Sequence, residues 1–111
     1  MTNSTSVTLI RHGETEWNLS GRWQGHADSP LSDRGVAQAE ALGKRMQPDD
    51  FDFFYSSDLG RALHTSRLLG GPSGWEAIPR EDFRERDLGI LEAMTTHEMM
   101  EREPEAYCSF R

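Results

Sequence analysis

A short run of β-branched and aliphatic residues leads directly into an arginine, a histidine and a glycine in residues 6–13, which read SVTLIRHG. Such a run is typical of a strand that is buried on both faces, so we expect a strand over residues 6–10. In open α/β sheets, ligands bind just beyond the carboxyl ends of the strands. Arg11, His12 and Gly13 occupy that position. We therefore expect a functional site where this strand ends.

The next segment, residues 11–31, lacks periodicity and is rich in Gly, Asn, Asp, Ser and Pro. Loops of that length in a compact domain are usually functional. Beyond it, helical and strand patterns alternate. We expect helices over residues 33–46, from Ser57 or Asp58 to Leu69, and from Thr95 or Thr96 to a break at Pro104, with strands over residues 51–56 and 76–79. This order predicts an α/β protein, a three-layer fold with a largely parallel sheet and flanking helices, as a single domain over residues 1–111.

The composition narrows the class of protein. The 111 residues carry a net charge of −7, which argues against nucleic-acid binding. No apolar run approaches the length of a membrane span, and the N-terminus lacks the basic and apolar parts of a signal peptide. We therefore expect a cytoplasmic protein with no membrane partner. Cys108 is the one cysteine, which leaves no internal disulfide.

Three chemically active side chains are expected to meet at one edge of the sheet. His12 follows the first strand, Arg61 lies one turn into the helix after the second, and Glu85 follows the third. A histidine is a nucleophile when its other ring nitrogen is held as N–H, for example by a backbone carbonyl. Arginines clamp a phosphoryl group with paired hydrogen bonds, and a carboxylic acid can protonate the leaving alcohol. The set therefore points to phosphoryl transfer.

The same residues also have purely structural explanations. Arg61 could form a salt bridge on its own helix, and Glu85 could belong to a solvated charged run over residues 82–87. His12, His26, His64 and Cys108 have no recognised metal-ligand spacing, so we expect no metal site.

Three blocks, in order along the chain, resemble the histidine phosphatase superfamily, also called the phosphoglycerate mutase-like family. They are RHGETEWN at residues 11–18 with GRWQG at 21–25, SSDLGRALHTS at 56–66, and FRERDLG at 83–89. The GRWQG segment is similar to the phosphatase branch. The resemblance implies a partial phosphoglycerate mutase-like fold. It also implies a phosphomonoester hydrolase that acts on a small phosphorylated substrate through a phosphohistidine, without metal or cofactor.

The resemblance further implies a role for each site residue. His12 is similar to the family's phosphate-accepting nucleophile, Arg11 and Arg61 to its phosphate clamp, and Glu85 to its general acid and base. Asn18, Gln24 and Arg86 resemble substrate contacts.

The chain departs from the family pattern in one respect that bears on activity. The family carries a second catalytic histidine followed by glycine late in the chain, and no His-Gly pair follows His12 here. Family chains are also longer, so the resemblance implies truncation at the C-terminus. Two alternatives stay open: a phosphoglycerate mutase-type phosphotransferase, and a non-catalytic phosphate-binding fragment. A sheet edge left uncovered would favour pairing, which also leaves a homo-oligomer open.

Overall fold

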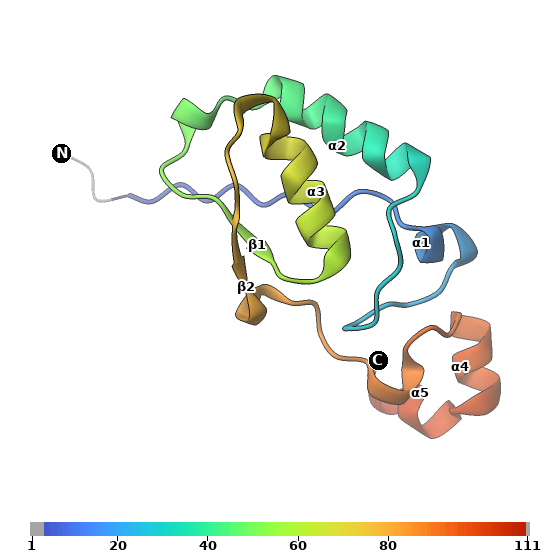
Figure 1. Ribbon diagram of the computed structural model, residues 1–111. Helices are drawn as coiled ribbons and strands as arrows, with labels where there is room; N and C mark the ends of the chain where they lie inside the picture. Colours follow the sequence, from blue (N-terminus) through green and yellow to red (C-terminus); the bar gives the residue numbers. More distant parts are fainter. Residues whose placement is uncertain (1–3, 111) are drawn as a thin grey trace.

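Two packed helices beside a small parallel sheet form the centre of the computed structural model, which describes residues 4–110 (Figure 1). The helices are α2 (Asp33–Arg45) and α3 (Gly60–Gly70), and the strands are β1 (Tyr55–Ser57) and β2 (Ile78–Arg80). Within the ladder, Ser56 pairs with Pro79. Both strands of a two-stranded sheet are edge strands, which is where a proline without an N–H is tolerated. The expected α/β class, with parallel strands and flanking helices, is confirmed.

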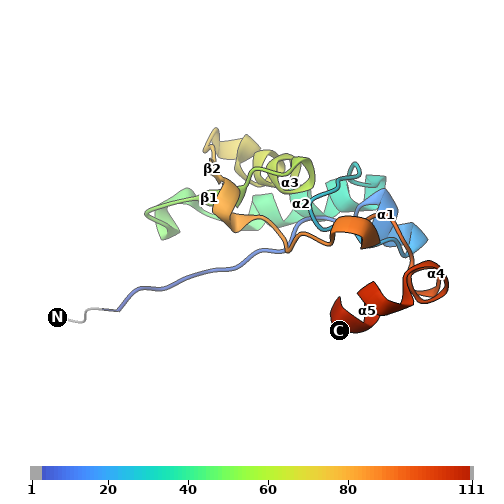
Figure 2. The ribbon, with the colours of Figure 1, turned by 90° about the horizontal axis from the view of Figure 1, so that it is seen from below.

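The remaining elements are short. Helix α1 (Glu16–Ser20) lies within the long N-terminal loop, and α4 (Thr96–Arg102) and α5 (Pro104–Phe110) form a pair at the end of the molecule away from β1 and β2 (Figures 1 and 2). Single 3₁₀ turns occupy η1 (Pro48–Asp50), η2 (Gly71–Ser73), η3 (Glu81–Phe83) and η4 (Gly89–Leu91). Among residues 4–110, no helix has the length and apolar character needed to cross a bilayer.

Side-chain caps explain where the helices begin. Ser32 Oγ accepts the Gly35 N–H at 3.1 Å at the start of α2, and Thr95 Oγ1 accepts the Glu98 N–H at 3.2 Å at the start of α4. Each satisfies a backbone donor that has no partner inside its helix. The helix expected over residues 33–46 is confirmed as α2, and of the two expected caps for α4, Thr95 and Thr96, the structure shows Thr95.

One expected boundary is wrong. Ser57 and Asp58 do not cap α3, because Ser57 still belongs to β1 and its hydroxyl accepts the Leu59 N–H at 3.2 Å in the turn before the helix. The break expected at Pro104 is confirmed, since α4 ends before it. Pro104 also begins α5, because a proline in the first turn of a helix removes no intrahelical hydrogen bond.

The strand expected over residues 6–10 is not formed. These residues are extended, but the described sheet consists of β1 and β2 alone. Val7 and Leu9 are 75% and 90% exposed, and Figure 2 shows the segment running apart from β1 and β2. A strand needs a neighbour for its backbone N–H and C=O groups, and no segment of residues 4–110 lies in register to supply one.

The long loop is closed at its base. An isolated antiparallel bridge joins Thr15 to Leu31, with the Glu16 N–H donating to Pro30 O at 3.0 Å and the Ser32 N–H to Glu14 O at 2.8 Å. The Thr15 side chain is completely buried there. This closure brings the end of the N-terminal segment against the first turn of α2.

Gly35 is needed for that contact. A Cβ at this position would overlap the backbone carbonyl of Glu14, which cannot move without breaking the loop closure. Gly35→Ala is therefore expected to lower the free energy of unfolding by about 1–3 kcal/mol, the usual cost of overpacking. Gly71→Ala is the matched control, because a Cβ there meets open space at a helical φ of −52°. Urea unfolding followed by tryptophan fluorescence measures both, and equal midpoints would contradict the prediction.

Candidate active site

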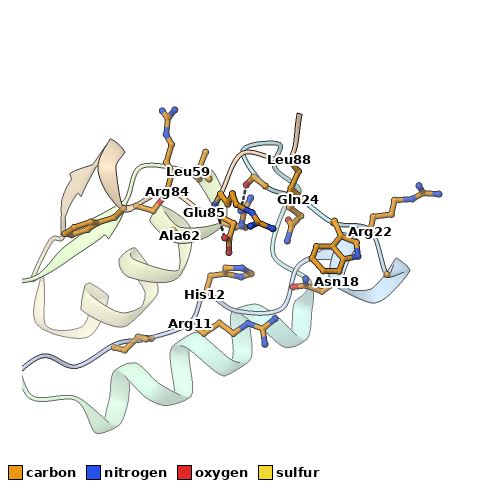
Figure 3. Close-up of a pocket in the computed structure, with 18 residues that line it drawn as sticks. Arg11, His12, Asn18, Arg22, Gln24, Leu59, Ala62, Arg84, Glu85 and Leu88 are labelled. Carbon is orange, nitrogen blue, oxygen red and sulfur yellow. Dashed lines mark hydrogen bonds between the residues drawn. The ribbon is translucent and has the colours of Figure 1, made fainter. Parts of the chain in front are cut away.

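A cavity of about 880 Å³ lies between the long loop, α3 and the segment that follows β2 (Figure 3). Its lining includes all seven residues that the sequence singles out: Arg11, His12, Asn18, Gln24, Arg61, Glu85 and Arg86. The structure thus brings together residues from three separate blocks of the sequence. Their chemical roles remain predictions.

The geometry of His12 fixes which ring nitrogen is available. His12 Nδ1 lies 2.7 Å from the carbonyl oxygen of Gly13, and because a carbonyl only accepts, Nδ1 must carry the proton and donate. In the neutral ring, Nε2 then holds the free lone pair. This is the arrangement that a histidine nucleophile needs.

The backbone beside His12 is held by α3. The Gly13 N–H donates to Thr65 Oγ1 at 3.0 Å, and that hydroxyl donates in turn to the Arg61 carbonyl at 2.8 Å. Thr65 is buried and was not singled out from the sequence. Its position one helical turn after Arg61 is the signal that could have identified it.

His12 is expected to titrate below free histidine. Burial lowers its pKa from the ordinary 6.5; the hydrogen bond to Gly13 and the charge of Asp28 oppose this, while the guanidinium groups of Arg61 and Arg11 reinforce it. The neutral ring should therefore persist as the pH falls through 6.5. An NMR titration of the His12 ring protons measures this. A midpoint at or above the ordinary histidine value of 6.5 would contradict the prediction.

Arg61 is a buried arginine in the cavity wall whose guanidinium is held by hydrogen bonds to the loop. Only 4% of its surface is exposed, and it donates through Nη1 to Ala27 O at 2.7 Å and to Asp28 Oδ1 at 3.2 Å, and through Nη2 to Gly25 O at 2.6 Å. Those bonds engage three of the five N–H donors of a guanidinium, and Nε and the second Nη2 hydrogen are left for a ligand in the cavity. The helix-surface salt bridge considered as an alternative is not what Arg61 forms.

Two amides offer donors to the same space. Asn18 Oδ1 accepts the Thr15 N–H at 2.9 Å as part of the α1 cap, and Gln24 Oε1 accepts the Ser29 hydroxyl at 3.1 Å. Because both amide oxygens are engaged, each amide nitrogen is the group left to donate to an anion.

Glu85 and Arg86 reach the cavity from the coil after η3. In Figure 3 the Glu85 carboxyl points toward the His12 ring, and its Oε1 accepts the Arg86 N–H at 2.8 Å. Both side chains are exposed, as is Arg11, so the cavity is open to solvent on this side.

The other cavity arginines, Arg22 and Arg84, have carboxylate partners. Arg22 Nη1 bonds Glu98 at 3.0 Å and the Ala93 carbonyl at 2.6 Å, which attaches α4 to the long loop. Arg84 pairs with Asp58 at 2.6 and 2.9 Å. That pairing holds the pKa of Asp58 below its usual value, so Asp58 is a carboxylate at neutral pH.

No other histidine joins the site. Among the described residues, His12 is the one histidine in the cavity lining. His26 Nδ1 lies 3.8 Å from Asp87, and His97 Nε2 lies 3.1 Å from Glu101 on the surface of α4. Within residues 4–110, no three His, Cys, Asp or Glu side chains are grouped closely enough to hold a metal ion.

Known proteins match this chain closely over its length. The model of the histidine phosphatase superfamily (branch 1) matches residues 7–111. A phosphoglycerate mutase-like protein 4 of Arabidopsis thaliana is 37% identical over 94% of this chain and 46% of its own length. A metal-independent phosphoserine phosphatase of the same plant is 40% identical over 96% and 45%.

A solved structure of a phosphatase is also similar to this chain. The alpha-ribazole phosphatase of Shigella flexneri superposes with a TM-score of 0.83 at 34% identity, over 91% of this chain and 50% of that one. The chain spans about half the length of the curated relatives it matches. The match over residues 7–111, together with the cavity that gathers the three sequence blocks, shows that the chain belongs to the histidine phosphatase superfamily.

Proposed function

We propose that this chain takes part in phosphate monoester hydrolysis through a phosphohistidine on His12. The observation that carries the proposal is the 2.7 Å contact between His12 Nδ1 and Gly13 O, which leaves Nε2 as a nucleophile in an arginine-lined cavity. The family match and the phosphatase names among the relatives support the same reaction class.

In the first step, the lone pair of His12 Nε2 forms a bond to phosphorus while the bond from phosphorus to the ester oxygen breaks. Arg61 and Arg11 bind the non-bridging phosphoryl oxygens, where charge is held in the transition state. Asn18, Gln24 and Arg86 add donors around the same group. Glu85 gives its proton to the departing alcohol oxygen.

In the second step, the roles reverse. The Glu85 carboxylate takes a proton from water, the water oxygen bonds to phosphorus, and the P–N bond to His12 breaks. Inorganic phosphate leaves, and both residues return to their starting states.

Two other functions have specific support. The first relative's name, phosphoglycerate mutase-like, favours transfer of the phosphoryl group to a second hydroxyl instead of water. The presence of one histidine, His12, in the cavity lining of the described residues favours phosphate binding without turnover.

The direct test is phosphorylation of the chain itself. The chain is mixed in excess with p-nitrophenyl phosphate, with and without a chelator, and p-nitrophenol release and covalently bound, acid-labile phosphate are measured. The proposal is supported if, at each time, the p-nitrophenol released equals the sum of bound phosphate and inorganic phosphate, with bound phosphate appearing first. Phosphate-induced thermal stabilisation without p-nitrophenol release would favour the binding fragment.

Glu85→Gln is expected to have an effect that depends on the leaving group. General acid catalysis contributes about 10²–10⁴-fold when the leaving alcohol is basic, and little when it departs as a stable phenolate. The variant should therefore release serine from phosphoserine about 100-fold more slowly, and p-nitrophenol at nearly the unsubstituted rate. Single-turnover release of each alcohol is the measurement, and an equal loss for both esters would remove Glu85 from the role of acid.

A further inference from the structure

The pair formed by Asp58 and Arg84 is a two-point contact beside the cavity, and we call it the Asp58–Arg84 fork. Arg84 Nε donates to Asp58 Oδ1 at 2.6 Å and Nη2 donates to Oδ2 at 2.9 Å. The two side chains are 31% and 28% exposed, so the pair is partly shielded from water. Two parallel charge-assisted bonds fix orientation as well as distance.

The fork joins a residue in the turn after β1 to a segment that has no regular secondary structure. Asp58 follows β1 directly, in the turn that leads into α3. Residues 84–88 lie outside every helix and strand and carry Glu85, whose side chain is exposed. Two contacts tie the start of this coil to β1 and the turn after it: the Arg84 pair with Asp58, and the Phe83 ring packed edge-on against Tyr55.

Because of the backbone conformation at Arg84, its contact with Asp58 also orients the next residue, Glu85. Arg84 has φ −64° and ψ 152°, the polyproline-II conformation, in which successive side chains point in directions about 120° apart. In Figure 3 the side chains of Arg84 and Glu85 leave the chain in different directions, and that of Glu85 points toward His12. Holding the Arg84 side chain away from the cavity therefore holds the Glu85 side chain toward His12.

We propose that the Asp58–Arg84 fork is a positioning device that holds the Glu85 carboxyl over His12. The inference rests on the proposed function, in which Glu85 protonates the leaving alcohol. Asp58 touches no reacting atom and acts through Arg84 and Glu85. A displacement of a catalytic group by about 1 Å can cost up to about 100-fold in rate.

The test compares two esters in single turnover. Asp58→Asn is expected to slow serine release from phosphoserine by about 10- to 100-fold while p-nitrophenol release from p-nitrophenyl phosphate changes little. Arg84→Lys keeps the charge but loses the fork geometry and should behave alike. In a Glu85→Gln chain, Asp58→Asn should have no further effect on either ester.

The chain supplies a matched control pair. Arg80 donates to Asp82 through Nε and Nη2, both at 3.1 Å, with the same fork chemistry on the exposed surface and outside the cavity lining. Asp82→Asn should leave both release rates unchanged. Equal losses for the two esters in Asp58→Asn, or a further loss in the Glu85→Gln chain, would make the fork a general structural contact and overturn the proposal.

A second measurement needs no turnover. Amide hydrogen exchange over residues 85–88 should quicken in Asp58→Asn and Arg84→Lys but not in Asp82→Asn, while α3 amides stay unchanged. Unchanged exchange over residues 85–88 overturns the positioning inference by itself. Absence of p-nitrophenol release from the unsubstituted chain overturns the proposed function instead, so the two failures are distinguishable.

Discussion

Replacing His12 with alanine is expected to abolish p-nitrophenol release and phosphate attachment to the chain. The residue supplies the atom that bonds to phosphorus, and no other described histidine lines the cavity. Loss of a covalent nucleophile lowers turnover by about 1,000-fold or more in enzymes of this kind of mechanism. The measurement is p-nitrophenol release by the chain and the variant at equal concentration.

The control for His12→Ala is His64→Ala. His64 is exposed on α3, so its loss removes a histidine without touching the cavity. We expect unchanged release in this control and an unchanged urea midpoint in both variants. Release that persists in His12→Ala would show that another group accepts the phosphoryl group and would contradict the proposed mechanism.

The sequence predicts that His12, Arg61 and Glu85 lie together, because ligands bind at strand ends and each of the three follows a strand pattern directly or one helical turn later. The cavity contains all three, although the strand expected before His12 is not formed. The family resemblance, and not the strand pattern, indicates Asn18, Gln24 and Arg86. A backbone carbonyl was expected to hold one ring nitrogen of His12 as N–H, and the structure shows that the Gly13 carbonyl does so, 2.7 Å from Nδ1.

The strand over residues 6–10 shows where such prediction fails. The pattern of Val7, Leu9 and Ile10 indicates only that these residues favour an extended, buried conformation. Whether they are buried depends on what lies beside them. The described residues supply no pairing partner, so the extended conformation persists while Val7 and Leu9 stay exposed.

The ion pairs between charged residues could not be predicted from the sequence either. Asp58 and Arg84 are 26 positions apart, and nothing in either block indicates that they pair. A run of charges over residues 82–87 is compatible with solvent exposure at every position. Only the turn after β1, set against the coil after η3, brings the two side chains together.

Arg61→Met is the second substitution with a large expected effect, and it acts on both stability and binding. The guanidinium is buried and donates to the Gly25 and Ala27 carbonyls and to Asp28. Removing it leaves two carbonyls and a carboxylate without these donors, and breaking a buried charged network typically costs about 3–5 kcal/mol. We expect a loss near about 3 kcal/mol, because the Asp28 side chain is 35% exposed and can be rehydrated.

A loss of that size is a large part of the stability of a small domain, so binding must be tested separately from folding. Arg61→Lys serves this purpose: it keeps the positive charge but cannot donate to three oxygens at once. Under conditions where urea unfolding shows the lysine variant folded, its dissociation constant for inorganic phosphate should rise at least about tenfold, as expected when a charge-assisted pair of bonds is lost. Unchanged phosphate affinity in the folded variant would mean that Arg61 stabilises the loop around Gly25 and Asp28 but does not bind the phosphoryl group. The clamp would then rest on Arg11 and Arg86, the exposed arginines of the cavity.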